Sequence, residues 1–191
     1  MKVVAFNGSA RKGGNTYELL NLVCEEIKNE GIDTEIIQFG GKHIQGCIAC
    51  YKCFENKNMR CNVDKDDLNF FLEKMLEADG ILLGSPTYVA DMSTNMKALI
   101  ERAGLVSRAN GDMFKRKVGA GVVAARRGGA TNVFSTMNYF FFIAQMIVPG
   151  SSYWNFAIGK DPGEVMSDEE GIQTMRTLGE NMAWLIKKVN S

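Results

Sequence analysis

The sequence predicts an α/β fold, a doubly wound five-stranded parallel sheet in a three-layer α/β/α arrangement. Short apolar runs alternate with amphipathic segments along the chain, and this alternation is typical of parallel strands joined by crossover helices. The length of 191 residues suits one domain, so we expect residues 1–191 to fold as a unit. One segment, residues 40–64, follows neither a helical nor a strand period and forms an insertion after the second strand.

The first expected strand, Val3–Asn7, is short and apolar, and a glycine-rich turn at Gly8–Asn15 follows it. Thr16–Asn29 has helical periodicity, and Gly31 is suitably placed to end that helix. Asp33–Phe39 alternates between polar and apolar side chains and is expected to be the second strand.

The rest of the chain continues the alternation, and Ser93 is expected to cap one helix while Ser167 and Glu170 form a capping box for the last. The expected elements are a helix at Asp66–Ala78, a strand at Gly80–Ser85, a loop at Pro86–Asp91, a helix from Ser93 to about Ala103, a strand at Val118–Ala125, a helix at Ala130–Met146, a strand at Ser151–Ile158 and a helix from Ser167 to Val189. This order indicates the flavodoxin-like type of fold, in which ligands bind at the carboxyl ends of the strands.

The loop after the first strand, Gly8–Thr16, has the composition of an anion site. Backbone N–H groups at a helix N-terminus attract a phosphate, and Ser9, Asn15 and Thr16 add neutral donors while Arg11 adds a planar cation. The loop lacks the G-K-[ST] ending of a Walker loop and the G-x-G-x-x-G dinucleotide fingerprint. A single phosphate is therefore the favoured ligand.

Two further loops are expected at the same edge of the sheet. Gly84–Tyr88 offers peptide groups and an aromatic ring to a flat heterocycle, although a simple packing turn would have the same sequence. Ala124–Thr131 combines small residues with Arg126 and Arg127, one of which could stabilise an anionic reduced ring. A solvated turn would also explain the two arginines, and their roles stay open.

Four of the five cysteines lie within Gly46–Cys61. Three follow a C-x2-C-x2-C spacing that suits three corners of a cuboidal iron–sulfur cluster, and a fourth can close the set. Zinc usually takes two separated C-x2-4-C pairs, and a disulfide between such close cysteines is unfavourable. Cys24 falls in an amphipathic helix and is expected to be a small core residue. The only histidine, His43, is expected to be structural.

Composition excludes several classes of protein. Lys and Arg together number 22 and Asp and Glu together 22, so no basic excess indicates a nucleic-acid partner. The chain begins on a strand without a signal-peptide pattern, which predicts a cytoplasmic protein. The most apolar stretch, Tyr139–Val148, contains Gln145 and stops at Pro149, so it is too short to span a membrane. With Tyr153 and Trp154 it is expected to form core and subunit interface.

Taken together, these motifs resemble those of the iron–sulfur flavoprotein family, within the wider NADPH-dependent FMN reductase and flavodoxin-like group. Gly8–Thr16 resembles the family's phosphate loop, and Ser85–Tyr88 followed by Met96–Arg102 resembles its ring-binding segment. The compact cysteine motif is matched by Cys47, Cys50, Cys53 and Cys61. The spacer before Cys61 lies at the long end of the family's range.

The resemblance implies FMN and a [4Fe–4S] cluster bound by Cys47, Cys50, Cys53 and Cys61. It also implies homo-oligomers, dimers or tetramers, and a ferredoxin-like electron donor. From the loops and the resemblance together, the expected FMN-binding residues are Ser9, Arg11, Gly14, Asn15, Thr16, Pro86, Thr87, Tyr88, Ala125, Arg126, Gly128 and Gly129.

The favoured function is that of an electron-transfer flavoprotein that passes electrons between a ferredoxin-like donor and an acceptor, with no side chain acting as an acid–base catalyst. One alternative is an NAD(P)H-dependent FMN or quinone reductase whose cysteine loop binds zinc or nothing. Another is a redox or metal sensor, which the absence of a basic face and of a DNA-binding module disfavours.

Overall fold

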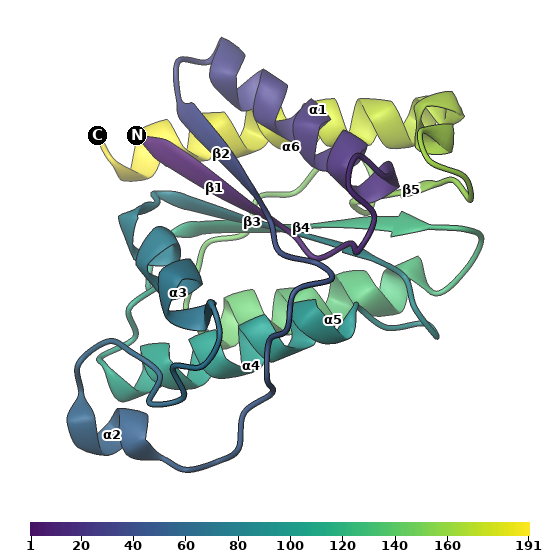
Figure 1. Cartoon of the computed structure of the whole chain (residues 1–191). Helices are drawn as coiled ribbons and strands as arrows, with labels where there is room; N and C mark the ends of the chain where they lie inside the picture. The colour runs from purple at the N-terminus through teal and green to yellow at the C-terminus, as the bar shows by residue number, and fades with distance from the viewer.

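A computed structural model describes every residue of the chain, 1–191. It contains a sheet of five parallel strands in the order β2-β1-β3-β4-β5 (Figure 1). The strands are β1 Lys2–Asn7, β2 Asp33–Gln38, β3 Gly80–Pro86, β4 Val118–Ala125 and β5 Phe156–Ile158. This order reverses direction between β1 and β3, which places a crevice at the carboxyl ends of those strands, as doubly wound sheets require.

Helices cover both faces of the sheet. They are α1 Asn15–Asn29, α2 Lys52–Asn56, α3 Leu68–Glu77, α4 Thr94–Ala109, α5 Ala130–Ile143 and α6 Glu169–Val189, with a 3-10 helix, η1, at Glu164–Ser167. Figure 1 shows α1 and α6 above the sheet, α3, α4 and α5 below it, and the short α2 projecting beyond α4. The predicted three-layer fold is therefore confirmed.

Two hydrophobic clusters hold the layers together, one on each face of the sheet. The β4 strand is buried along its whole length, as expected for a parallel strand covered on both sides. On the lower face, Phe6, Phe39 and Phe71 pack their rings against one another with centroids 5.4 to 6.3 Å apart. These aromatic contacts fix the start of the cysteine segment, which leaves the sheet directly after Phe39.

The fifth strand is shorter than predicted. Only Phe156–Ile158 pairs with β4, not the whole of the predicted range 151–158. The chain first touches β4 at a bridge between Ile147 and Val118, and Pro149 follows. Proline has no N–H to donate to a ladder, so the bridge does not extend past it. The hydroxyls of Ser151 and Ser152 then bond to Thr174 of α6, and pairing with β4 begins again only at Phe156.

The predicted capping box at Ser167 is wrong. Ser167 ends η1, and Asp168 caps α6 by accepting from the N–H of Gly171 at 2.9 Å. The other oxygen of Asp168 accepts from the N–H of Ile158 at 2.8 Å, so the same carboxylate also fixes the end of β5. The predicted cap at Ser93 is confirmed, because its side chain accepts from the N–H of Met96.

Other elements also differ from prediction: α3 spans Leu68–Glu77 rather than Asp66–Ala78, and α5 ends at Ile143 rather than Met146. The α4 helix continues to Ala109 rather than Ala103, because Gly104 faces Phe140 of α5 and the packing offsets the low helix propensity of glycine. The inserted segment contains one short helix, α2, where no regular structure was predicted.

The apolar segment around α5 is half core and half surface. Phe140 and Phe141 are buried. Tyr139, Phe142 and Ile143 are between 62% and 68% exposed, which leaves a band of apolar side chains on the surface. No helix of the structure is long and apolar enough to cross a membrane.

Candidate functional site

One pocket lies where four loops meet at the carboxyl ends of β1, β3, β4 and β5. The loops after β1, β3 and β4 were expected to contribute to the lining, and the loop after β5 was not. Its residues are Ser9, Arg11, Asn15, Thr16, Pro86, Thr87, Tyr88, Ala124, Arg126, Gly159 and Lys160. The three loops singled out in the sequence therefore converge on one pocket.

The first loop is held by a chain of side-chain hydrogen bonds. Asn7 accepts from the N–H of Ser9 at 3.0 Å and donates to Gln38 at 2.6 Å. Gln38 in turn donates to the carbonyl of Ser9 at 2.5 Å. Behind the loop, a Cβ on Gly40 would lie 2.1 Å from the Ser9 carbonyl oxygen, so only glycine fits there. These contacts fix Ser9, whose hydroxyl accepts from the N–H of Arg11 at 3.2 Å.

The N-terminus of α1 is suited to an anion. Gly14 is its N-cap and supplies no side chain to satisfy the first N–H groups of the helix. Three cations, Arg11, Arg126 and Lys160, line the pocket, and no Asp or Glu does. Open N–H donors and unopposed positive charge are what a phosphate group requires.

The second loop presents an aromatic ring and an unused hydroxyl. Tyr88 and Asp91 form two backbone hydrogen bonds, 2.8 and 2.9 Å long, around a tight turn. Val89 and Ala90 in that turn have positive φ angles of 50° and 59°. The Thr87 hydroxyl is buried without a hydrogen-bond partner in the protein, which leaves it available to a ligand.

Four of the predicted flavin-site residues lie outside the pocket lining: Gly14, Ala125, Gly128 and Gly129. Gly129 has a positive φ of 85°, and a Cβ there would lie 2.8 Å from Ala90, so this glycine makes room for the Tyr88 turn. The carbonyl of Ala125 accepts from the N–H of Gly159 at 2.8 Å. Of the two arginines, Arg126 lines the pocket and Arg127 does not.

Asn15 has a structural task that its sequence position did not reveal. Its amide donates to the Gly159 carbonyl at 3.0 Å and accepts from the N–H of Gly163 at 2.8 Å. These two bonds fasten the loop after β5 to the start of α1. Gly159 and Lys160 thereby join the pocket, and sequence reasoning missed both because nothing in the local pattern marks them as a site.

All four clustered cysteines line a second pocket. Its other walls are mostly apolar, and its one charged residue is Arg102. The lining residues are Cys47, Ile48, Cys50, Tyr51, Cys53, Cys61, Val63, Arg102, Leu105 and Val106. Cys61, separated from the others by the longest spacer, is thus brought to the same place.

The backbone between the cysteines turns sharply. Ala49 and Tyr51 have positive φ angles of 52° and 55°, a region that costs non-glycine residues energy and is usual only where the surroundings impose it. The N–H of Ala49 donates to the sulfur of Cys47 at 3.4 Å. N–H groups directed at cysteine sulfur are a feature of iron–sulfur sites.

Arg102 of α4 fastens this segment from within the protein. Its side chain is 1% exposed and forms an ion pair of 2.5 Å with Asp66. It also donates to the carbonyls of Gln45 at 3.0 Å and Val63 at 2.6 Å. Two further bonds, 3.4 and 3.3 Å long, end on the sulfur of Cys61. One buried guanidinium therefore ties both ends of the cysteine segment to α4.

Asp66 and Asn69 complete these attachments. Burial pushes the pKa of Asp66 upward, but hydrogen bonds from Arg102 and from two backbone N–H groups outweigh it and hold the pKa below its ordinary value. The Asn69 side chain accepts from the N–H of Cys61 at 2.8 Å and donates to its carbonyl at 3.0 Å. None of these three residues was selected from the sequence, because each acts through a partner distant in the chain.

The four clustered cysteines form neither a preformed site for a single ion nor a disulfide. No three His, Cys, Asp or Glu side chains are grouped so that they could hold a single metal ion, whereas zinc needs thiolates at ~2.3 Å from one centre. No disulfide is present. His43 is exposed and is not part of the lining. Cys24 lies apart in the core, where burial raises its pKa to about 11.

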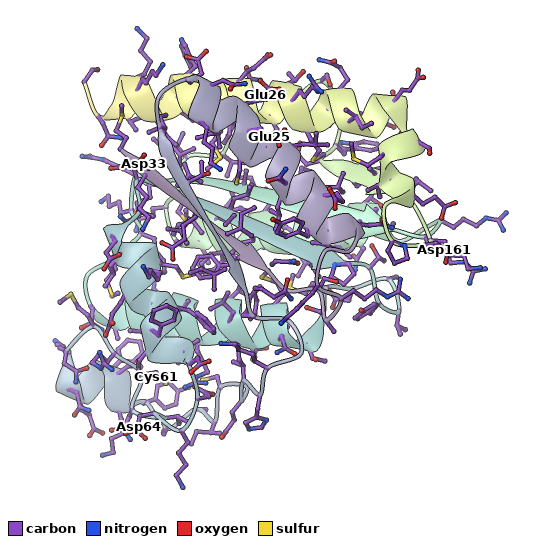
Figure 2. The ribbon with its side chains drawn as sticks, turned by 45° about the horizontal axis from the view of Figure 1, so that its top comes forward. Glu25, Glu26, Asp33, Cys61, Asp64 and Asp161 are labelled. Carbon is purple, nitrogen blue, oxygen red and sulfur yellow. The ribbon has the colours of Figure 1, made fainter.

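The two pockets share no residue. Figure 2 shows Cys61 and Asp64 beside α2 and α3, and Asp161, which follows Lys160 of the first pocket, at the other end of the molecule. One chain therefore carries a pocket lined by three cationic side chains and, at a separate place, a cysteine pocket.

Comparison with known sequences identifies the family of the chain. Residues 1–161 match the family described as NADPH-dependent FMN reductase. An iron–sulfur flavoprotein of Methanocaldococcus jannaschii is 37% identical over 99% of this chain and 99% of its own length. The iron–sulfur flavoprotein of Methanosarcina thermophila is 30% identical over 99% of this chain and 97% of its own.

Solved structures share the fold. A crystal structure of RosB has a TM-score of 0.75 at 18% identity and covers 100% of this chain and 80% of its own. A WrbA-like flavodoxin from Agrobacterium tumefaciens has a TM-score of 0.67 at 14% identity, over 98% and 97% of the two chains. At such identities these neighbours establish the fold alone. From the family match and the sequence relatives, the chain is a flavin-dependent redox protein that belongs to the NADPH-dependent FMN reductase family and, within it, to the iron–sulfur flavoproteins.

Proposed function

We propose that the chain is an electron-transfer flavoprotein that binds FMN in the first pocket and a [4Fe–4S] cluster in the cysteine pocket. It would pass electrons between a ferredoxin-like donor and an acceptor. The observation that carries the proposal is the convergence of Cys47, Cys50, Cys53 and Cys61 on one pocket in a chain that also has a phosphate-type pocket. The cluster exchanges single electrons and the flavin one or two, so the redox chemistry comes from the cofactors.

In the first pocket, the task of the protein is to bind and orient FMN. The open N–H groups of α1, with Ser9, Thr16 and Arg11, would hold the phosphate, and Lys160 adds a further cation. Pro86–Tyr88 would lie along the ring, where the buried Thr87 hydroxyl gains the partner it lacks. Arg126 is the cation available to offset negative charge on a reduced ring.

In the cysteine pocket, the protein supplies four sulfur ligands and a largely apolar wall. Val63, Leu105 and Val106 exclude water from one side. Ala49 and Arg102 direct N–H groups at the sulfurs of Cys47 and Cys61. Apolar surroundings and N–H donors are the protein features that set the potential of such a centre.

A second candidate is an NAD(P)H-dependent FMN or quinone reductase without a working cluster. The name of the matched family favours it. The arrangement of the cysteine pocket counts against it, because a plain hydride-transferring reductase has no use for four converging thiols and a buried arginine that holds one of them.

The apolar band on α5 supports self-association, as a dimer or tetramer. Tyr139, Phe142 and Ile143 are largely exposed, and Tyr153 and Trp154 are about half exposed nearby in the chain. Exposed apolar surface of this kind is characteristic of subunit contacts. Assembly could also bring the cysteine pocket of one copy close to the flavin pocket of another.

The test is an anaerobic preparation assayed for FMN, iron and acid-labile sulfide on the same sample. The proposal predicts about one FMN, about four irons and about four sulfides per chain. Replacing Cys47, Cys50, Cys53 or Cys61 by serine should lower iron and sulfide, while Cys24→Ser serves as the control that leaves both unchanged. FMN with zinc or with no metal would instead support the reductase.

A further inference from the structure

We propose that Arg102 is a positioning residue for the cysteine site: it fixes Cys61 as the fourth ligand and raises the reduction potential of the cluster. This inference rests on the proposed function, because it concerns the same cofactor. It adds a residue that is not itself a ligand and that the sequence motif of four cysteines does not contain.

The contacts of Arg102 use the whole guanidinium. Its donors are divided among a carboxylate, two carbonyls and one sulfur, all within the inserted segment or at its end. Because Arg102 is also 1% exposed, none of these bonds competes with water. A buried guanidinium whose N–H groups are all hydrogen-bonded is held firmly in one position.

Cys61 needs such support more than the other three cysteines do. Cys47, Cys50 and Cys53 are spaced three residues apart, so the local backbone turns bring them together. Cys61 follows after seven intervening residues, from Phe54 to Arg60. Two contacts place it: the Asn69 side chain pairs with its backbone, and Arg102 donates to its sulfur. Only Arg102 acts on the ligand atom itself.

The same bonds have an electronic consequence. A cluster gains negative charge when it is reduced, and N–H donors on its cysteine sulfurs stabilise that charge. Arg102 adds a full positive charge within hydrogen-bond distance of one ligand sulfur, 3.3 Å away. Asp66 offsets part of this charge through the ion pair. Removing the donation should therefore make the potential more negative.

Lysine cannot replace arginine here. An ammonium has three donors and a guanidinium has five in a fixed planar fork. Lysine at position 102 could keep the pair with Asp66 while losing the fork that reaches the Cys61 sulfur. Arg102→Lys thus keeps the positive charge but removes the hydrogen bonds to the Cys61 sulfur, so it separates the effect of these bonds from the effect of the charge.

The experiment compares wild type, Arg102→Lys, Asp66→Asn and Arg108→Lys after anaerobic purification. Iron and sulfide are assayed, the oxidised protein is examined by electron paramagnetic resonance for a three-iron cluster, and the cluster potential is measured by redox titration. Arg108 is an exposed arginine on the same helix and serves as the matched control. FMN content and circular dichroism report on folding, since the flavin pocket shares no residue with the cysteine pocket.

The expected result is that Arg102→Lys shifts the potential to a more negative value and produces a three-iron signal. Asp66→Asn should leave the potential unchanged or more positive, because the Cys61 bonds remain and the compensating carboxylate is gone. A wild-type potential and full iron content in Arg102→Lys would overturn the inference. Equal loss of the cluster in Arg102→Lys and Asp66→Asn would also overturn it, since Arg102 would then only fold the segment. Wild-type protein without iron and sulfide would instead refute the proposed function.

Discussion

Arg102 and Cys61 are 41 residues apart in the chain, yet two N–H groups of the guanidinium donate to the cysteine sulfur at 3.4 and 3.3 Å. This contact joins α4, one of the helices below the sheet, to the cysteine that is separated from the other three by the longest spacer. It anchors the inserted segment to the folded core, and we expect substitutions at this anchor to have the strongest effects on the cysteine site.

Asn69→Ala should weaken the cysteine site without touching any sulfur. The 6% exposed Asn69 exchanges two hydrogen bonds with the backbone of Cys61, and losing a buried partner costs roughly 1–3 kcal/mol. We expect lower iron content and faster loss of iron to a chelator. Asn62→Ala, at an exposed position nearby, is the control. Equal iron retention in the two variants would argue against a supporting role for Asn69.

Arg11→Gln should weaken FMN binding while leaving riboflavin binding almost unchanged. Arg11 lines the pocket at the uncapped end of α1, and a charge-assisted bond to phosphate on an exposed side chain corresponds to about a tenfold change in affinity. Fluorescence titration of the flavin-free chain with both flavins measures this. Arg127→Gln, outside the pocket lining, is the matched control. Equal weakening for FMN and riboflavin would contradict a phosphate role.

Gly40→Ala should disturb the first loop from behind. The added Cβ would lie 2.1 Å from the Ser9 carbonyl oxygen, so the loop must move. Overpacking of this kind costs about 1–3 kcal/mol, and we expect lower thermal stability together with weaker FMN binding. Gly150→Ala, where a Cβ would meet nothing within 4 Å and which lies outside the pocket lining, should change neither. Normal FMN affinity in Gly40→Ala would mean that the position of Ser9 does not matter for binding.

We expect the protein to lose folding stability in acid because of Asp66. Its pKa lies below the ordinary value of 3.8 because, against the effect of burial, hydrogen bonds from Arg102 and two N–H groups favour the carboxylate. A lowered folded-state pKa adds stability that is fully present above the unfolded-state pKa and is lost as pH falls through the folded-state value. The free energy of unfolding should therefore drop below about pH 4.

Denaturant unfolding across pH measures this dependence. Asp66→Asn should flatten the acid limb and cost about 3 kcal/mol at pH 7, because Arg102 is left as an unpaired buried charge. Asp64→Asn, at an exposed position, should leave both unchanged. An acid limb of the same slope in Asp66→Asn and wild type would assign the effect to other carboxylates.

The fold was largely predictable because the sequence alternates cleanly between buried runs and amphipathic segments. All five strands and the five long helices were found, and the errors concern their ends and the short helix α2, which was not predicted. Ser167 lost its predicted capping role because Asp168, one residue on, satisfies both Gly171 and Ile158. The fifth strand is shorter than predicted because Ser151 and Ser152 bond to Thr174 of α6 instead of continuing the strand along β4. Both outcomes depend on tertiary contacts that no local pattern contains.

The sites were predictable to the extent that their chemistry is local. Consecutive loop residues identified most of the lining of the first pocket, and the spacing of the cysteines identified the four sulfur-bearing residues of the second. Sequence reasoning did not assign Arg102, Asn69 or Lys160 to either site, because the local sequence around each of them is that of an ordinary helix or loop. Arg102 in particular reads as one polar residue of an amphipathic helix, and only its complete burial shows that its partners are inside.

The most direct test of the account is an anaerobic reductive titration that counts electrons per chain while following flavin and cluster absorbance. Electron transfer through two centres predicts uptake of about three electrons, about two by the flavin and about one by the cluster. The Cys61→Ser chain should take up about one electron fewer, because it lacks the contribution of the cluster. Uptake of about two electrons by the wild-type chain, the capacity of the flavin alone, would contradict the account.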